Sequence, residues 1–108
     1  MKAYVVVECF KGGKTPEIQG VYKDRTKAEE IKNNYRFAFI DEQNLIQILS
    51  EKKQAEVYVV YELLHLNVPR IIGVFKDKNS AKTVADDCKY IAYVNKQILN
   101  WFYIYEEQ

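Results

Sequence analysis

The spacing of apolar and polar positions along the chain alternates between a two-residue period and a helical one. Runs rich in Val and Tyr at residues 3–10 and 56–64 predict strands, and so do residues 18–23 and 70–76. Turn-forming residues, KGGKTP in the first case and HLNVP in the second, separate the members of each pair. The pattern therefore predicts two hairpins.

A helical period follows each predicted hairpin. Thr26 with Glu29 three residues later has the spacing of a capping box, and Asn79 stands at the matching place further on. Each helix is expected to lead into a third strand, at residues 44–50 and 100–105. The apolar positions at helical spacing are Ala28, Ile31, Tyr35 and Ala38 in the first case and Ala81, Val84, Ala85, Cys88 and Ala92 in the second.

Three blocks of sequence recur in the same order. YVVVECF matches YVVYELL, GVYKD matches GVFKD, and NLIQILSE resembles NWFYIYEE. Matches in a common order indicate an internal duplication. We therefore predict one pseudo-symmetric domain over residues 1–108, with repeat 1 at residues 1–53 and repeat 2 at residues 54–108.

The predicted fold class is α+β, with two tandem ββαβ repeats. In this arrangement one or more antiparallel sheets carry one helix per repeat, packed on one face. Each repeat alone is too short to bury a stable core, so the halves are expected to share a core or one continuous sheet. The pattern does not distinguish one six-stranded sheet from two packed sheets.

The combination of YVVYE, GVFKD, an early alanine in the helix and a closing strand with paired glutamates resembles a known family. That family consists of small uncharacterised bacterial and phage proteins built on single copies of the unit. The resemblance implies the fold and a bacterial or phage origin. It implies no activity and no catalytic residues.

The first strand of each repeat is apolar on both faces. Val5 and Val7 point to one side, and Tyr4 and Val6 to the other. One helix covers only one face, so the second face needs the other half, a second copy or a partner. We therefore expect a homodimer or a protein that binds another protein through aromatic anchors. The predicted partner-binding residues are Tyr58, Tyr61, Trp101, Tyr103 and Tyr105.

The charge balance limits the range of partners. The 108 residues include 16 Lys and Arg and 15 Asp and Glu, for a net charge of +1, which gives no broad positive field. The alternative function is nucleic-acid binding by basic residues of the first hairpin and helix, although acidic residues interleave with them. The residues that would bind nucleic acid are Lys11, Lys14, Lys23, Arg25, Lys27, Lys32 and Arg36.

Few residues suggest chemistry. Glu8 and Glu62 recur inside apolar strands, either as carboxylates that share a proton or a metal, or as exposed residues that discourage edge aggregation. KGGKT lacks the leading glycine and following helix of a phosphate-binding loop, so a hairpin turn is favoured. Cys9 and His65 would need an orienting acid to act together. We expect a non-enzymatic protein with no catalytic residues, metal or cofactor.

The cysteines and apolar runs bear on location. Two cysteines are too few for a disulfide framework, so reduced thiols are expected. The apolar run near the N-terminus is short and contains Glu8, and no later run approaches the length of a membrane span. These features favour a cytoplasmic protein that does not interact with membranes.

Overall fold

The computed structural model describes residues 2–9, 16–44, 54–64 and 68–100. These residues form six strands and two helices, which confirms the α+β class. In chain order the elements are β1 (Lys2–Glu8), β2 (Glu17–Tyr22), α1 (Arg25–Lys32), β3 (Ala38–Asn44), β4 (Gln54–Leu63), β5 (Pro69–Phe75), α2 (Lys78–Asp86) and β6 (Ala92–Asn100).

All six strands belong to one sheet in the order β3-β1-β2-β6-β4-β5. β1 lies between β3 and β2, β4 lies between β6 and β5, and both central strands are antiparallel to their neighbours. β2 and β6 run parallel, with Val21 opposite Leu99. The prediction of purely antiparallel pairing is wrong at this junction. β1 and β4 run in the same direction. Because β2 is antiparallel to β1 and β6 is antiparallel to β4, the two strands that meet at the junction, β2 and β6, are parallel.

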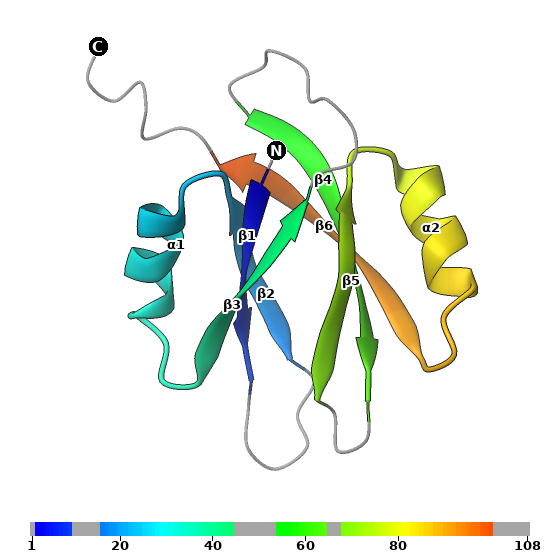
Figure 1. Ribbon diagram of the computed structural model, residues 1–108, viewed down its shortest axis with the longest axis horizontal. Coiled ribbons are helices and arrows are strands. Elements are labelled where there is room, and N and C mark those ends of the chain that lie inside the picture. The colour runs from blue at the N-terminus through cyan, green and yellow to red at the C-terminus, as the bar shows by residue number, and fades with distance from the viewer. Residues whose placement is uncertain (1, 10–15, 45–53, 65–67, 101–108) are drawn as a thin grey trace.

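The sheet curls so that one of its faces packs against itself. The side chains on the face away from the helices, called here the inner face, form one core cluster to which every strand contributes, including Phe39 of β3 and Leu99 of β6. A flat sheet cannot bury a face in this way, so strong curvature is required. Figure 1 shows the edge strands β3 and β5 side by side, with α1 and α2 on opposite sides of the strands. The two halves thus cover the face that was expected to need a second cover.

A glutamine side chain spans each junction between the halves. Nε2 of Gln97, on β6, donates a hydrogen bond to the carbonyl oxygen of Ile18 on β2 at 3.4 Å. Nε2 of Gln43, on β3, donates to the carbonyl oxygen of Ile71 on β5 at 3.5 Å. Because backbone pairing between β2 and β6 covers only two residue pairs, the Gln97 bond extends that contact along the strands, and the Gln43 bond joins the edge strands β3 and β5.

The helices begin at aspartates rather than at the predicted caps. The carboxylate of Asp24 accepts a hydrogen bond from the backbone N–H of Thr26 at 2.8 Å, and that of Asp77 accepts one from Ser80 at 3.0 Å. The prediction of Thr26 and Asn79 as caps is therefore wrong. The aspartate that ends each GVYKD or GVFKD block leaves the strand in an extended conformation and caps the helix directly.

The third strands begin earlier than predicted. β3 starts at Ala38 and β6 at Ala92, because α1 and α2 are only 8 and 9 residues long. Some apolar positions predicted on the helices lie beyond the helix ends, in connections or at the start of the next strand. A helix this short does not allow the helical period to be distinguished from the two-residue period of a strand. Most of the strand residues predicted at 44–50 and 100–105 lie outside the described residues.

Candidate functional site

Exposed large hydrophobic side chains concentrate in one segment that contains β6. Among the described residues, two others, Phe37 and Val68, share this exposure. Scattered exposed apolar residues are ordinary, whereas a run of them in one segment marks a candidate interaction surface. The exposed residues of the segment are Tyr90 (48%), Ile91 (69%), Tyr93 (42%), Val94 (36%) and Ile98 (44%).

Strand register places part of this segment on the face that bears the helices, called here the outer face. Val94, Lys96 and Ile98 lie opposite Val60, Tyr58 and Glu56 of β4, while the intervening residues of β4 face the inner core. Nζ of Lys96 lies 2.7 Å from Oε2 of Glu56, and this hydrogen-bonded ion pair raises the pKa of Lys96. We call this surface the outer patch; it consists of Glu56, Tyr58, Val94, Lys96 and Ile98.

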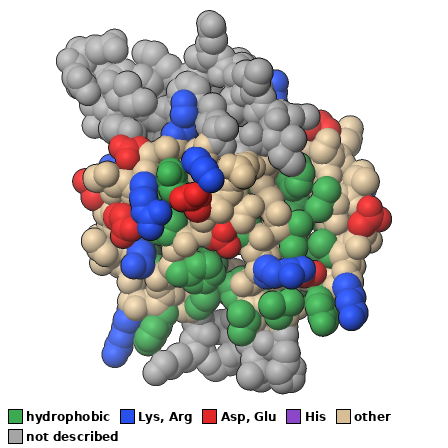
Figure 2. All heavy atoms as spheres, in the orientation of Figure 1, with side chains coloured by type: hydrophobic (Ala, Val, Ile, Leu, Met, Phe, Trp, Pro, Cys, Tyr) green, Lys and Arg blue, Asp and Glu red, His purple; other side chains and the backbone are tan. Residues whose placement is uncertain are grey.

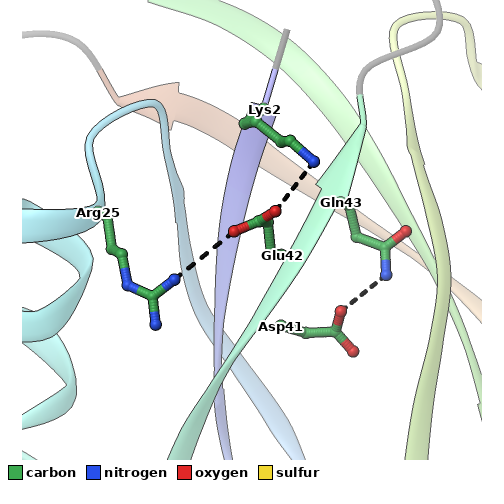
Figure 3. Close-up of polar contacts among 5 residues, drawn as sticks. All are labelled: Lys2, Arg25, Asp41, Glu42 and Gln43. Carbon is green, nitrogen blue, oxygen red and sulfur yellow. Dashed lines mark hydrogen bonds and ion pairs between the residues drawn. The ribbon is translucent and has the colours of Figure 1, made fainter.

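The first half carries a more polar arrangement at the corresponding place. Nζ of Lys2, on β1, lies 2.9 Å from Glu42 on β3, and this contact lowers the pKa of Glu42. Arg25 approaches from α1, with Nη1 3.5 Å from Glu42 and the guanidinium carbon 5.9 Å from the centre of the Tyr4 ring. Figure 3 shows Lys2 and Arg25 both pointing toward Glu42. A side chain from the helix therefore crosses over the sheet here.

The predicted partner-binding residues separate into three groups. Tyr58 is half-buried on the outer patch. Tyr61 faces the inner core and is 7% exposed, and burial raises its pKa. The centre of its ring lies 5.5 Å from the centre of the Tyr93 ring. In the isolated chain Tyr61 is thus a core residue, and the exposed ring beside it belongs to Tyr93. Trp101, Tyr103 and Tyr105 lie outside the described residues.

The apolar residues of β6 are not among the candidate residues that the sequence pattern predicts. The helical spacing predicts Ala92 on the second helix and the third strand only from residue 100, so no strand is expected between them. A usable signal was present: AFIDEQ at 38–43 matches AYVNKQ at 92–97 with the same offset of 54 that relates Tyr4 to Tyr58. Both segments form the strand that follows the helix.

Two basic residues of α1, Arg25 and Lys27, are paired with acids. Arg25 contacts Glu29 at 3.6 Å in addition to Glu42, and Lys27 contacts Glu30 at 3.7 Å. Figure 2 shows basic and acidic side chains interleaved over this side of the molecule. The other predicted nucleic-acid-binding residues are Lys23, half-buried with its pKa lowered by burial; Lys32, half-buried; Arg36, exposed over the Phe37 ring; and Lys11 and Lys14, outside the described residues.

Glu8 and Glu62 are not brought together. They lie on β1 and β4, which are not neighbours in the sheet, and each is on the outer face beneath a different helix. Glu62 is 1% exposed, so the expectation of an exposed residue is wrong for it. Arg70, opposite Glu62 on β5, forms an ion pair with its carboxylate. The Arg70 guanidinium contacts Oε1 of Glu62, and this ion pair compensates the buried charge.

Glu8 has a different environment. Its carboxylate is half-buried and accepts a hydrogen bond from Nε2 of Gln19 at 2.8 Å, and the same amide nitrogen lies 3.2 Å from Glu17. The hydroxyl of Tyr35 donates to Oε1 of Gln19 at 3.1 Å. The four side chains form a hydrogen-bonded network at the end of the first hairpin.

The cysteines are free and half-buried. Burial, followed by the nearby Glu8 carboxylate, raises the pKa of the Cys9 thiol. Burial also raises the pKa of Cys88, with a further contribution from Glu62. These directions are opposite to the one that activates a nucleophilic thiolate. His65, the histidine considered together with Cys9, lies outside the described residues.

The described part of the chain contains neither a cluster of metal ligands nor a membrane-spanning helix. No group of three or more His, Cys, Asp or Glu side chains there is placed to hold a metal ion. Neither helix there has the length and apolar character required to cross a membrane.

Fold and surface together define a small α+β protein with a curled mixed sheet and an exposed apolar strand. Comparison of the chain with protein-family models, curated proteins and solved structures yields no match.

Proposed function

We propose that this protein is a non-enzymatic protein-binding module that contacts its partner through the outer patch. The exposure of Val94 and Ile98 carries the proposal. The corresponding residues of β3 are Ile40, half-buried against the cluster beneath α1, and Asn44, which is polar. Since the first half forms without an exposed apolar pair here, the fold itself does not require one in the second half.

The composition of the outer patch also suits an interface. Val94 and Ile98 offer apolar area, Tyr58 offers a ring with a polar end, and the Lys96–Glu56 ion pair supplies polar groups. Interfaces bury apolar and aromatic residues of this kind together with polar groups that form contacts to the partner. The free cysteines support a reducing compartment, and we place the module in the cytoplasm as part of the proposal.

The proposal includes the origin of the chain by tandem duplication of a ββαβ unit. Support comes from register: Val6 pairs with Ile40 in the first half and Val60 with Val94 in the second, an offset of 54 in each strand. The matched glutamine bridges at the two junctions, from Gln43 and Gln97, have the same offset. A bacterial or phage source rests on the family resemblance alone.

Affinity capture with matched variants tests the function. The tagged full chain, a Val94→Lys/Ile98→Lys variant and a Val68→Lys control are used to capture partners from host cells, with and without nuclease. Val68 is 52% exposed and lies outside the outer patch, so it controls for the added charge. We expect one protein to co-purify with the wild type and the control but not with the double variant.

Two results would contradict this function. Equal capture by all three proteins would remove the outer patch from the interaction. Loss of every captured component on nuclease treatment would favour the alternative, nucleic-acid binding. The pairing of Arg25 and Lys27 with acids counts against that alternative.

A further inference from the structure

The outer patch contains one acid and one base at its centre. Glu56 and Lys96 have side-chain exposures of 51% and 63%, and apolar residues of β6 lie on both sides of Lys96 along the outer face. An ion pair this exposed adds little to the stability of one chain. Re-pairing these two charges with an approaching surface therefore costs the single chain little.

The corresponding pair in the first half is reversed and includes a third charged residue. There Lys2 on the central strand faces Glu42 on the edge strand, and Arg25 reaches over from α1 to contact Glu42 (Figure 3). In the second half, the position that corresponds to Arg25 lies 53 residues later and is occupied by Lys78, an exposed side chain at the start of α2. The second-half patch thus differs from the first in two ways: its flanking residues are apolar, and its acid and base are the reverse of those in the first half.

We propose that the outer patch binds a second copy of this chain, through an interface with two-fold symmetry. A two-fold axis places the same surface on both sides, so every contact occurs twice. A patch with one Glu beside one Lys complements itself under this operation, because Glu56 of each copy faces Lys96 of the other. Val94 and Ile98 then bury apolar area against the same residues of the other copy.

Charge balance selects a second copy over a partner of one sign. A strongly acidic partner would meet Glu56, and a strongly basic one would meet Lys96; like charges brought together at an interface are unfavourable. The inference rests on the proposed function and names the partner of the same surface.

Paired charge reversals test the interface. Lys96→Glu places two acids in each copy and Glu56→Lys places two bases, so each variant repels itself across the two-fold axis. In an equimolar mixture, the acidic patch of one variant meets the basic patch of the other. Sedimentation velocity over a concentration series, with native mass spectrometry, measures dimers of the full-length wild type, both variants, their mixture and a Val68→Lys control. Circular dichroism verifies that each is folded.

We expect the wild type and the Val68 control to dimerise, and each reversal to weaken dimerisation by more than about tenfold. The mixture should restore a dimer containing one chain of each variant. An ion pair confined within one chain cannot produce that rescue, because neither variant contains both signs.

Three results would overturn the inference: a monomeric wild type at every concentration, dimers of each variant as strong as those of the wild type, or a monomeric mixture. A monomeric wild type that still captures another protein dependent on Val94 and Ile98 would leave the proposed function standing. Absence of both dimer and capture would refute both proposals.

Discussion

Glu8 and Glu62 occupy corresponding positions, yet their chemistry differs because of the residue opposite each one. Glu17 faces Glu8 across the first hairpin, and the amide of Gln19 bonds both carboxylates. Arg70 faces Glu62 across the second hairpin, and the carboxylate is buried. An Arg on the neighbouring strand, where the first hairpin has a Glu, thus allows the Glu62 carboxylate to be buried, because a buried charge requires a nearby counter-charge.

Replacement of Arg70 tests this dependence. Arg70→Ala leaves the Glu62 charge buried without its cation, and we expect the free energy of unfolding to fall by about 2 kcal/mol. Urea denaturation of the full chain measures the change. In a Glu62→Gln background, the same replacement should cost less than half as much, because no buried charge remains. Equal costs in the two backgrounds would show that Arg70 acts through packing alone.

At the scale of elements, the sequence predicted the hairpins well and the segments after them poorly. β1, β2, β4 and β5 lie within two residues of their predicted ends because alternating Val- and Tyr-rich runs have a clear period. The helices are so short that capping decides where they begin, and the pattern alone did not distinguish Asp24 from Thr26. Similarly, the exposure of Ile98 depends on which strand lies beside β6, and that is a long-range property.

The glycines of the GVYKD and GVFKD blocks also differ in a way that their shared sequence conceals. Gly20 has φ of +152°, and a Cβ there would lie 2.5 Å from the hydroxyl oxygen of Tyr22. At Gly73 no positive φ occurs, and a Cβ would lie 3.0 Å from the Phe75 ring. Only the first combines steric overlap with a backbone conformation that favours glycine.

Matched substitutions distinguish these two glycines. We expect Gly20→Ala to lower the free energy of unfolding by about 2 kcal/mol and Gly73→Ala by about 1 kcal/mol. Thermal and urea unfolding measure both. In a Tyr22→Ala background the cost of Gly20→Ala should shrink to its backbone part. A larger loss at Gly73 than at Gly20 would contradict the assignment of strain to the first hairpin.

For the whole molecule, the curled sheet determines which surfaces remain available for binding. Its inner core combines residues of both halves, such as Val5 and Val7 with Val57 and Val59. The need for a second cover, which first suggested a dimer, is therefore met inside one chain. On the outer face, the outer patch provides an apolar and charged surface that the fold leaves exposed.

The shared core predicts that neither half exists as a folded monomer. Residues 1–53 and 54–108, produced separately, would each expose the inner-face valines to water, and a chain of that size has little other core to compensate. We expect each half either to be unfolded or to associate, since a second copy offers similar strands at the open junctions. Circular dichroism with sedimentation velocity separates these outcomes, and the full chain under the same conditions is the control. A half that unfolds cooperatively as a monomer would contradict the shared core, because one hairpin, helix and strand would then suffice to bury it.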